Sequence, residues 1–345
     1  MAYTTINKST DYFNSKIYTG TGSSLALTGI GFQPDWLWIK KRNGTVNNLL
    51  HDSVRGVTKL LVTNSNAAED TNTNILTSFN SDGFTVGTNS ASNGNNDTFA
   101  SWNWKANGSS TVTNNDGATT SYISHNSTAQ FSIIKYTGTG SNTNIGHGLN
   151  GTPDCFITKG YSGATDWHLW NNTFTVNQRI KINSTGGVSS NTSIFPTLPD
   201  ATKIYFGSGG DVNQSGVQYI CYAFKNVNGY SKSGSYKGNG DNNGSFVYTG
   251  FKPAFTIIKN TTTAGYDWVM DDVKRSPFNE MNNTLYANAN YVEYTGGAYG
   301  IDYLSNGFKI RDDHANYNKA GDTYIYTAFA KAPLVGSNNI PATAR

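Results

Sequence analysis

The acidic residues of this chain are the first candidates for chemistry, and they are few. Adjacent carboxylates occur at Asp271-Asp272 and Asp312-Asp313. A glycan hydrolase needs two carboxylates that face one bond, yet the only glutamates are Glu69, Glu280 and Glu293. Solvated loop acids therefore explain the pairs better than a catalytic dyad, and glycan hydrolysis is the remote alternative.

Metal and cofactor signatures are equally sparse. The histidines are scattered and never take metal-ligand spacing; they are His51, His125, His147, His168 and His314. The loop Asp241-Asn-Asn-Gly244 could hold calcium through its oxygens, but turn chemistry explains it equally well. The chain has no P-loop, no Gly-x-Ser-x-Gly elbow, no His-Glu-x-x-His and no paired-cysteine knuckle. The sequence therefore predicts a protein that is not an enzyme, with no catalytic residue, cofactor or metal.

Tryptophans flanked by polar residues are the candidate binding residues. Aromatic faces beside amides and carboxylates can stack sugars and hydrogen-bond their hydroxyls. The alternative is core packing, because the chain has little else to bury, and the recurrence of Asp166-Trp167 as Asp267-Trp268 favours it. The candidate contacts for a glycan or receptor are Trp102, Trp104, Trp167, Trp170 and Trp268.

The two cysteines, Cys155 and Cys221, leave a disulfide open. A secreted disulfide scaffold carries more cysteines at closer spacing, so two buried free thiols are the favoured interpretation. The first ten residues lack the apolar core of a secretory signal, which predicts synthesis in a cytosol without a removed leader.

Composition predicts the elements that must position these residues. The chain of 345 residues has 13% aromatic residues, 37 Gly and 44 Asn, with only 14% charged residues. Thr, Tyr, Phe, Trp, Val and Ile favour strands, and Gly and Asn favour tight turns. Many short strands joined by many turns follow, so the fold class is all-β.

Three copies of one pattern organise the chain. Tyr18-Thr-Gly-Thr-Gly22 returns at Tyr136 and, as Tyr-Lys-Gly-Asn-Gly, at Tyr236. A proline turn and a strand follow, and a lysine lies six positions after each proline, at Lys40, Lys159 and Lys259. Each copy closes on an aromatic strand: 99–105, 219–225 and 324–331. The runs 36–39 and 255–258 are apolar at nearly every position, as in strands buried on both faces.

These landmarks predict three tandem β-sandwich modules of about 90–100 residues. The expected boundaries are a first module with an N-terminal arm at 1–106, a polar linker at 107–130, further modules at 131–228 and 229–333, and a tail at 334–345 that dangles or docks on a partner. The stretch 48–61 fits either a helix or a pair of strands. The middles of the copies diverge (49–74, 169–195 and 269–290), so specificity is expected there.

Charge argues against two partners. The net charge is +3, and each third of the chain carries +1, so no basic face marks a nucleic-acid site. No stretch approaches the length of a membrane helix. We expect no nucleic-acid binding and no membrane insertion.

The chain resembles a group of virion structural proteins of marine tailed bacteriophages, of the cyanophage and pelagiphage type. The residues that carry the resemblance are the opening 1–14, the Tyr-Thr-Gly-Thr-Gly and Gly-Phe-Gln-Pro-Asp-Trp turns, 230–236 and the closing 323–330. It covers essentially the whole chain and implies tail-fibre-like proteins with repeats similar to concanavalin-type, lectin-like jelly rolls. The group offers no agreed catalytic residues.

The resemblance implies a protein of the virion, assembled in the host cytoplasm. The first expectation is a tail-fibre or tail-associated adhesin that presents lectin-like modules to a host surface glycan. The alternative is a capsid decoration or head-projection protein, and an envelope-glycan hydrolase is the remote third. Expected partners are other tail or capsid proteins. A homo-oligomer, a trimer for a fibre, is possible, although the chain has no heptads to form a stalk.

Overall fold

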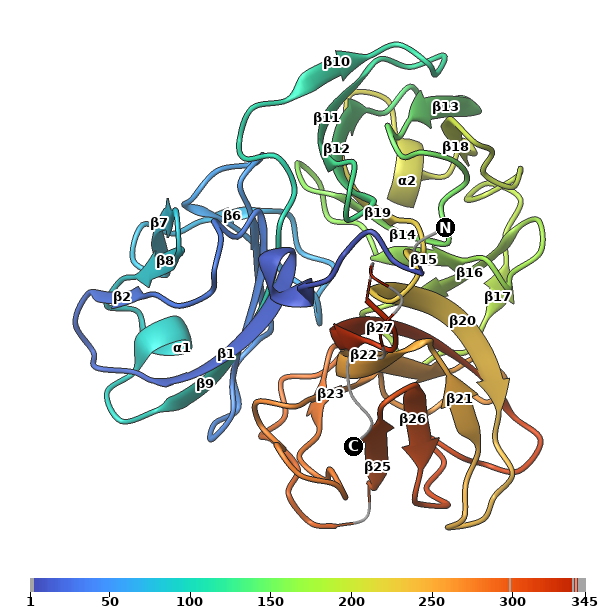
Figure 1. Ribbon diagram of the computed structural model, residues 1–345. Helices are drawn as coiled ribbons and strands as arrows, with labels where there is room; N and C mark the ends of the chain where they lie inside the picture. The colour runs from blue at the N-terminus through green and yellow to red at the C-terminus, as the bar shows by residue number, and fades with distance from the viewer. Residues whose placement is uncertain (1–2, 298, 337, 339, 341–345) are drawn as a thin grey trace.

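A computed structural model describes residues 3–297, 299–336, 338 and 340. It is built of antiparallel sheets, as an all-β sandwich fold requires, and three copies form three lobes in Figure 1 (blue, green to yellow, orange to red). Within the described residues, no helix is long and apolar enough to cross a membrane.

Copy 1 contains a large and a small sheet, ordered β1-β9-β3-β4-β5-β6 and β2-β8-β7. Its elements are η1 (Ser9–Asp11), β1 (Phe13–Thr19), β2 (Leu25–Leu27), β3 (Trp36–Lys41), β4 (Leu49–Asp52), β5 (Lys59–Val62), β6 (Asp70–Thr71), β7 (Leu76–Asn80), β8 (Gly83–Val86), α1 (Ser90–Asn93) and β9 (Thr98–Trp104). The stretch 48–61 therefore forms a strand pair, β4 and β5.

Copy 2 has the order β10-β11-β12-β19-β14-β15-β16-β17 in its large sheet and β13-β18 in its small one. The strands and helix are β10 (Val112–Asn114), β11 (Ser121–Asn126), β12 (Phe131–Thr137), β13 (Thr143–Gly146), β14 (Cys155–Gly160), β15 (His168–Asn171), β16 (Gln178–Lys181), β17 (Ser189–Ser190), β18 (Lys203–Phe206), α2 (Gly210–Asn213) and β19 (Gln218–Phe224).

Copy 3 repeats the plan with sheets β20-β27-β22-β23-β24 and β21-β26-β25. Its strands are β20 (Ser231–Lys237), β21 (Phe246–Tyr248), β22 (Phe251–Asn260), β23 (Val269–Asp272), β24 (Leu285–Tyr286), β25 (Ile301–Leu304), β26 (Gly307–Ile310) and β27 (Thr323–Pro333).

The prediction that residues 107–130 form a linker is wrong. It supplies β10 and β11, and β11 pairs with β12 along five residues, from Tyr122 opposite Lys135 to Asn126 opposite Phe131. The polar composition hid these strands because an outer strand needs few apolar side chains, and here Ile123 is the buried aliphatic residue. Of the tail, Leu334 donates its amide to the carbonyl of Gly250, while 337, 339 and 341–345 lie outside the described residues.

The repeated glycine turns have a packing reason. A Cβ on the first glycine of each turn would lie 2.2–2.4 Å from a backbone oxygen, and the second glycine has φ of 69–78°, which favours glycine. The first glycines are Gly20, Gly138 and Gly238, and the second are Gly22, Gly140 and Gly240. In each copy the preceding tyrosine stacks on the first aromatic of the closing strand, at 5.0–5.1 Å between ring centroids.

The three copies close into a ring around a shared aromatic core. One face of each large sheet packs on its own small sheet, and the other faces the neighbouring copies, so β3 is buried on both faces as expected. Across the centre, the ring centroids of Trp36 in copy 1 and Tyr222 in copy 2 lie 4.9 Å apart. Those of Phe224 in copy 2 and Phe329 in copy 3 lie 5.7 Å apart. Phe13 of copy 1 stacks on Phe329 at 5.1 Å and closes the circle. The modules are therefore one packed unit rather than a string.

The lysine six positions after each proline holds this ring together. Each lysine donates to a backbone carbonyl of another copy: Lys40 to Asn290 at 3.1 Å, Lys159 to Asn66 at 3.1 Å and Lys259 to Thr185 at 3.0 Å. The contacts run cyclically, from copy 1 to 3, 2 to 1 and 3 to 2. Burial lowers the pKa of all three lysines to about 8. The accepting carbonyls belong to the divergent middles, which are thus partly contact surfaces between copies.

Candidate functional site

All five candidate tryptophans are core residues, with at most 4% of their surface exposed. Trp104 packs 4.4 Å from Trp36 in the central core, and Trp170 stacks on Phe156 at 5.4 Å. The expectation that Trp102, Trp104, Trp167, Trp170 and Trp268 contact a glycan is therefore corrected. The polar neighbours of Trp102 and Trp104 lie on the opposite face of β9, since side chains alternate along a strand, and this hid the burial.

The Asp-Trp pairs act between copies. The indole of Trp167 donates to the carbonyl of Val62 at 3.0 Å, and that of Trp268 donates to Lys181 at 2.9 Å. In copy 1 the equivalent position is Asn48, whose amide donates to Tyr286 at 3.0 Å. Three equivalent residues thus bind three equivalent strands of the neighbouring copies, β5, β16 and β24, and recurrence here reflects a structural role.

The acidic pair on β23 is divided between two environments. Asp272 accepts from Arg275 at 2.5 Å and from the indole of Trp102 at 3.0 Å, in the contact between copies 3 and 1. Asp271 accepts from Thr284 and Tyr317, each at 2.9 Å, inside copy 3. Because consecutive strand residues point to opposite faces, the two carboxylates do not face one bond. The buried Asp312 accepts the amide of His314 in a turn.

Copy 1 carries the same buried ion network at the equivalent place. Arg55 lies 2.5 Å from Asp52 and 2.9 Å from Glu69, while Arg275 lies 3.0 Å from Glu293. Nearby carboxylates raise the pKa of both guanidinium groups. In copy 2 the corresponding residues are Asn171, Phe174 and Val188. Two of the three glutamates of the chain therefore serve the contacts between copies.

Both thiols are free. Cys155 pairs with Phe224, and Thr158 pairs with Cys221, so the cysteines lie on opposite faces of the large sheet of copy 2. Burial raises the pKa of Cys155 to about 12 and raises that of Cys221 as well. This register excludes a disulfide between them.

One group that sequence spacing missed could approach a cation. Among the described residues, Asp166, His168 and Asp211 offer ligand atoms within 4.8 Å of one another. His168 Nε2 lies 3.0 Å from Asp211 Oδ2, and this contact lowers the pKa of Asp211 to about 2. Lys181 already pairs with Asp166. No pattern could reveal the group, because Asp211 lies 43 residues after His168. In the proposed calcium loop, Asp241 accepts the amide of Asn243 at 2.7 Å, which is turn chemistry.

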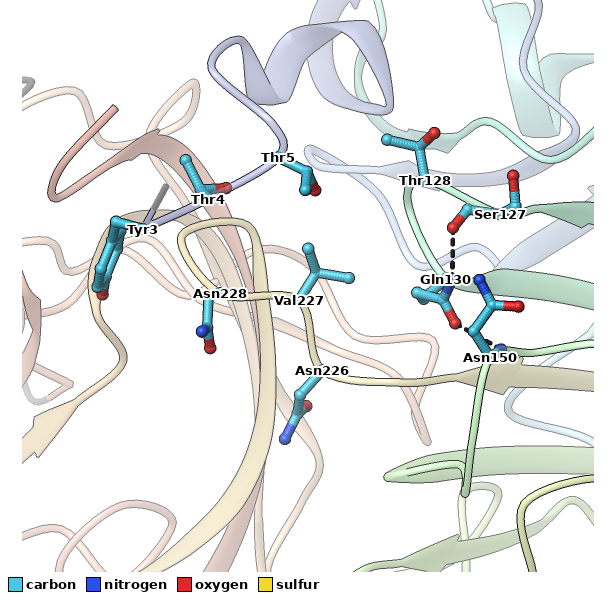
Figure 2. A pocket seen from close by; sticks show the side chains of 10 residues that line it. All are labelled: Tyr3, Thr4, Thr5, Ser127, Thr128, Gln130, Asn150, Asn226, Val227 and Asn228. Atoms are coloured by element: carbon cyan, nitrogen blue, oxygen red, sulfur yellow. Dashed lines mark hydrogen bonds between the residues drawn. The ribbon is translucent and has the colours of Figure 1, made fainter. Parts of the chain in front are cut away.

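A polar pocket lies where the copies join. It measures about 580 Å³ and is formed by the N-terminal arm, the bend before β12, the turn before β14 and the connection from β19 to β20. Figure 2 shows two groups of side chains facing each other across it. One comprises Tyr3, Thr4, Thr5, Asn226, Val227 and Asn228, and the other comprises Ser127, Thr128, Gln130 and Asn150.

Hydrogen bonds fix part of the pocket wall. Gln130 donates to the carbonyl of Ser127 and accepts the amide of Asn150 at 2.8 Å. Gln130 has a backbone φ of 52°, in the left-handed region that residues other than glycine rarely adopt. Tyr3 donates to the carbonyl of Gly250 at 2.9 Å, so the arm reaches copy 3. Burial, with the hydrogen bond to Tyr248, raises the pKa of Tyr3 to about 12.

One family model spans all three copies. A family model described as a domain of unknown function, DUF7483, matches residues 8–333. The chain belongs to this family. The matched segment runs from just before η1 to the end of β27, so a single DUF7483 domain contains all three copies. No curated protein and no solved structure matches the chain.

Proposed function

We propose that this DUF7483 protein is a non-enzymatic virion protein, a tail-fibre or tail-associated adhesin that presents its rim to the host surface. The observation that carries the proposal is the closed ring. Its tryptophans, buried lysines and acid–arginine networks all make contacts between copies. Such residues stabilise a rigid scaffold and do not form a reactive cleft. The likeness to virion proteins of marine tailed phages supplies the setting.

A scaffold held this way suits a particle outside the cell. The contacts between copies combine aromatic packing with buried ion networks, and buried networks of this kind favour one specific arrangement when fully hydrogen-bonded. The inward faces of the large sheets are buried against other copies, so ligands are left to the rim loops and to the pocket at the copy junctions.

Electron microscopy of intact particles with a gold-labelled antibody against the protein tests this proposal. Labelling at the tail, together with purified protein that binds host cells and blocks infection, is the expected result. Labelling over the head at a copy number near that of the coat protein would favour capsid decoration instead. Release of sugars from host envelope, abolished in Asp271→Asn or Asp312→Asn, would favour the hydrolase.

A further inference from the structure

The pocket at the copy junctions has a lining of one chemical kind. Its ten residues are hydroxyl and amide residues with a single aliphatic one, Val227, and none carries a formal charge. The volume of about 580 Å³ lies in the range of small-molecule sites. The lining offers no charged side chain to pair with a phosphate, a carboxylate or a cation.

Several of these side chains are exposed and have no protein partner. Within the described residues, the side chains of Thr5, Asn150 and Asn228 are solvent-exposed and make no hydrogen bond. An amide presents two donors and an acceptor, and a hydroxyl presents one donor and accepts. The free groups therefore match a ligand that carries many neutral hydroxyl groups.

We propose that this pocket binds a neutral carbohydrate. Asn150 and Asn228 come from opposite sides of the opening in Figure 2, so a saccharide that lies across the opening faces both side chains. Tyr3, at the end of the pocket farthest from Asn150 in that view, supplies an aromatic ring next to the hydrogen-bonding groups. The site deepens the proposed adhesin function, on which its biological role rests, but its binding chemistry stands on the pocket alone.

The wall that faces the sugar is organised before binding. Gln130 is held on both amide atoms, and Asn226 is held by the backbone of Ser233, whose amide donates to it at 2.6 Å. Fixed polar groups lose little conformational entropy on binding, which favours affinity. The arm residues Tyr3 and Thr4 form one wall, so the ligand contacts segments from four parts of the chain.

Saturation-transfer NMR and titration calorimetry on the full chain test the site. The neutral probes are cellobiose, chitobiose, maltotriose and lactose, each up to about 10 mM, a range that covers weak affinities of a few kcal/mol. Inorganic phosphate and a heparin disaccharide are the anionic probes. We expect one or more neutral saccharides to bind, with neither anion binding.

Variants then locate the binding. Asn228→Trp fills the opening from an exposed position, and Asn150→Ala removes one hydrogen-bonding group; each should weaken binding at least ten-fold. Asn242→Ala, an exposed asparagine in the β20–β21 loop outside the pocket lining, is the matched control and should bind as the parent does. Circular dichroism melts confirm that each variant is folded.

Three outcomes overturn the proposal: no neutral saccharide binds, only the anions bind, or Asn228→Trp binds as tightly as the parent. Such a result leaves the adhesin proposal standing if gold labelling still marks the tail. Conversely, saccharide binding by a protein that labels only the head overturns the adhesin proposal and keeps the pocket.

Discussion

The hydroxyl of Tyr222 lies 2.7 Å from Oδ2 of Asp52, and this buried hydrogen bond joins copies 1 and 2 across 170 residues of sequence. Its counterpart joins copies 3 and 1, where the indole of Trp102 donates to Asp272. Two of the three junctions of the ring thus carry equivalent polar contacts in addition to the aromatic packing.

Tyr222→Phe should destabilise the protein by about 1–3 kcal/mol, because it leaves a buried carboxylate without one of its donors. Chemical denaturation measures the change. Tyr205→Phe is the matched control, since Tyr205 makes an equally short bond to Asp200 at 2.7 Å near the surface of copy 2. An equal loss of unfolding free energy in the two variants would show that the contact between copies contributes no more to stability than a hydrogen bond near the surface.

Asp271 should make stability fall as the pH rises. Burial raises its pKa from 3.8 to about 6, so the folded protein binds more protons than the unfolded chain between these values. Stability therefore decreases from about pH 4 to pH 6 through this group. Asp271→Asn should remove that slope in denaturation curves measured at pH 4, 5, 6 and 7. An unchanged slope would mean that Asp271 is already charged in the folded state at pH 4.

The repeat, the strands and their turns could be predicted from the sequence, because glycine turns and apolar runs are local signals. The recurrence of Lys40, Lys159 and Lys259 six positions after each proline could be recognised in the sequence. Their hydrogen bonds to neighbouring copies could not. A buried lysine that serves a neighbouring copy has the same sequence pattern as one that ends an exposed strand.

The candidate site could not be predicted for a related reason. Trp102 and Trp104 alternate with polar residues, which is the pattern of a half-exposed strand, and only the ring shows that the second face is covered by another copy. The polar pocket combines residues 3–5, 127–130, 150 and 226–228, and no local pattern relates them.

Cys155→Val should stabilise the protein by about 1 kcal/mol. Cys155 occupies the position held by Trp36 in copy 1 and Phe255 in copy 3, and it lines an apolar cavity of about 30 Å³ in the central core. Filling such a space recovers buried apolar contact. Cys221→Val is the control, because Cys221 is buried outside this cavity and added volume there forces strain. Thermal melts should therefore move in opposite directions, and a drop for both variants would show that the cavity cannot accept a methyl group.

The ion network of copy 1 should be replaceable as a unit but not in part. Arg55→Met removes the cation from the buried Asp52, while the partly exposed Glu69 keeps Lys59 at 3.5 Å. Removal of one partner of a buried pair costs about 3–5 kcal/mol. The combined variant Asp52→Asn, Arg55→Phe and Glu69→Val installs the residues that copy 2 uses at the equivalent positions, Asn171, Phe174 and Val188. It should unfold within about 1 kcal/mol of the parent, because apolar packing replaces a buried ion network at little net cost. Denaturant titration compares the two variants, and a combined variant no more stable than Arg55→Met would show that the three contacts between copies are not interchangeable.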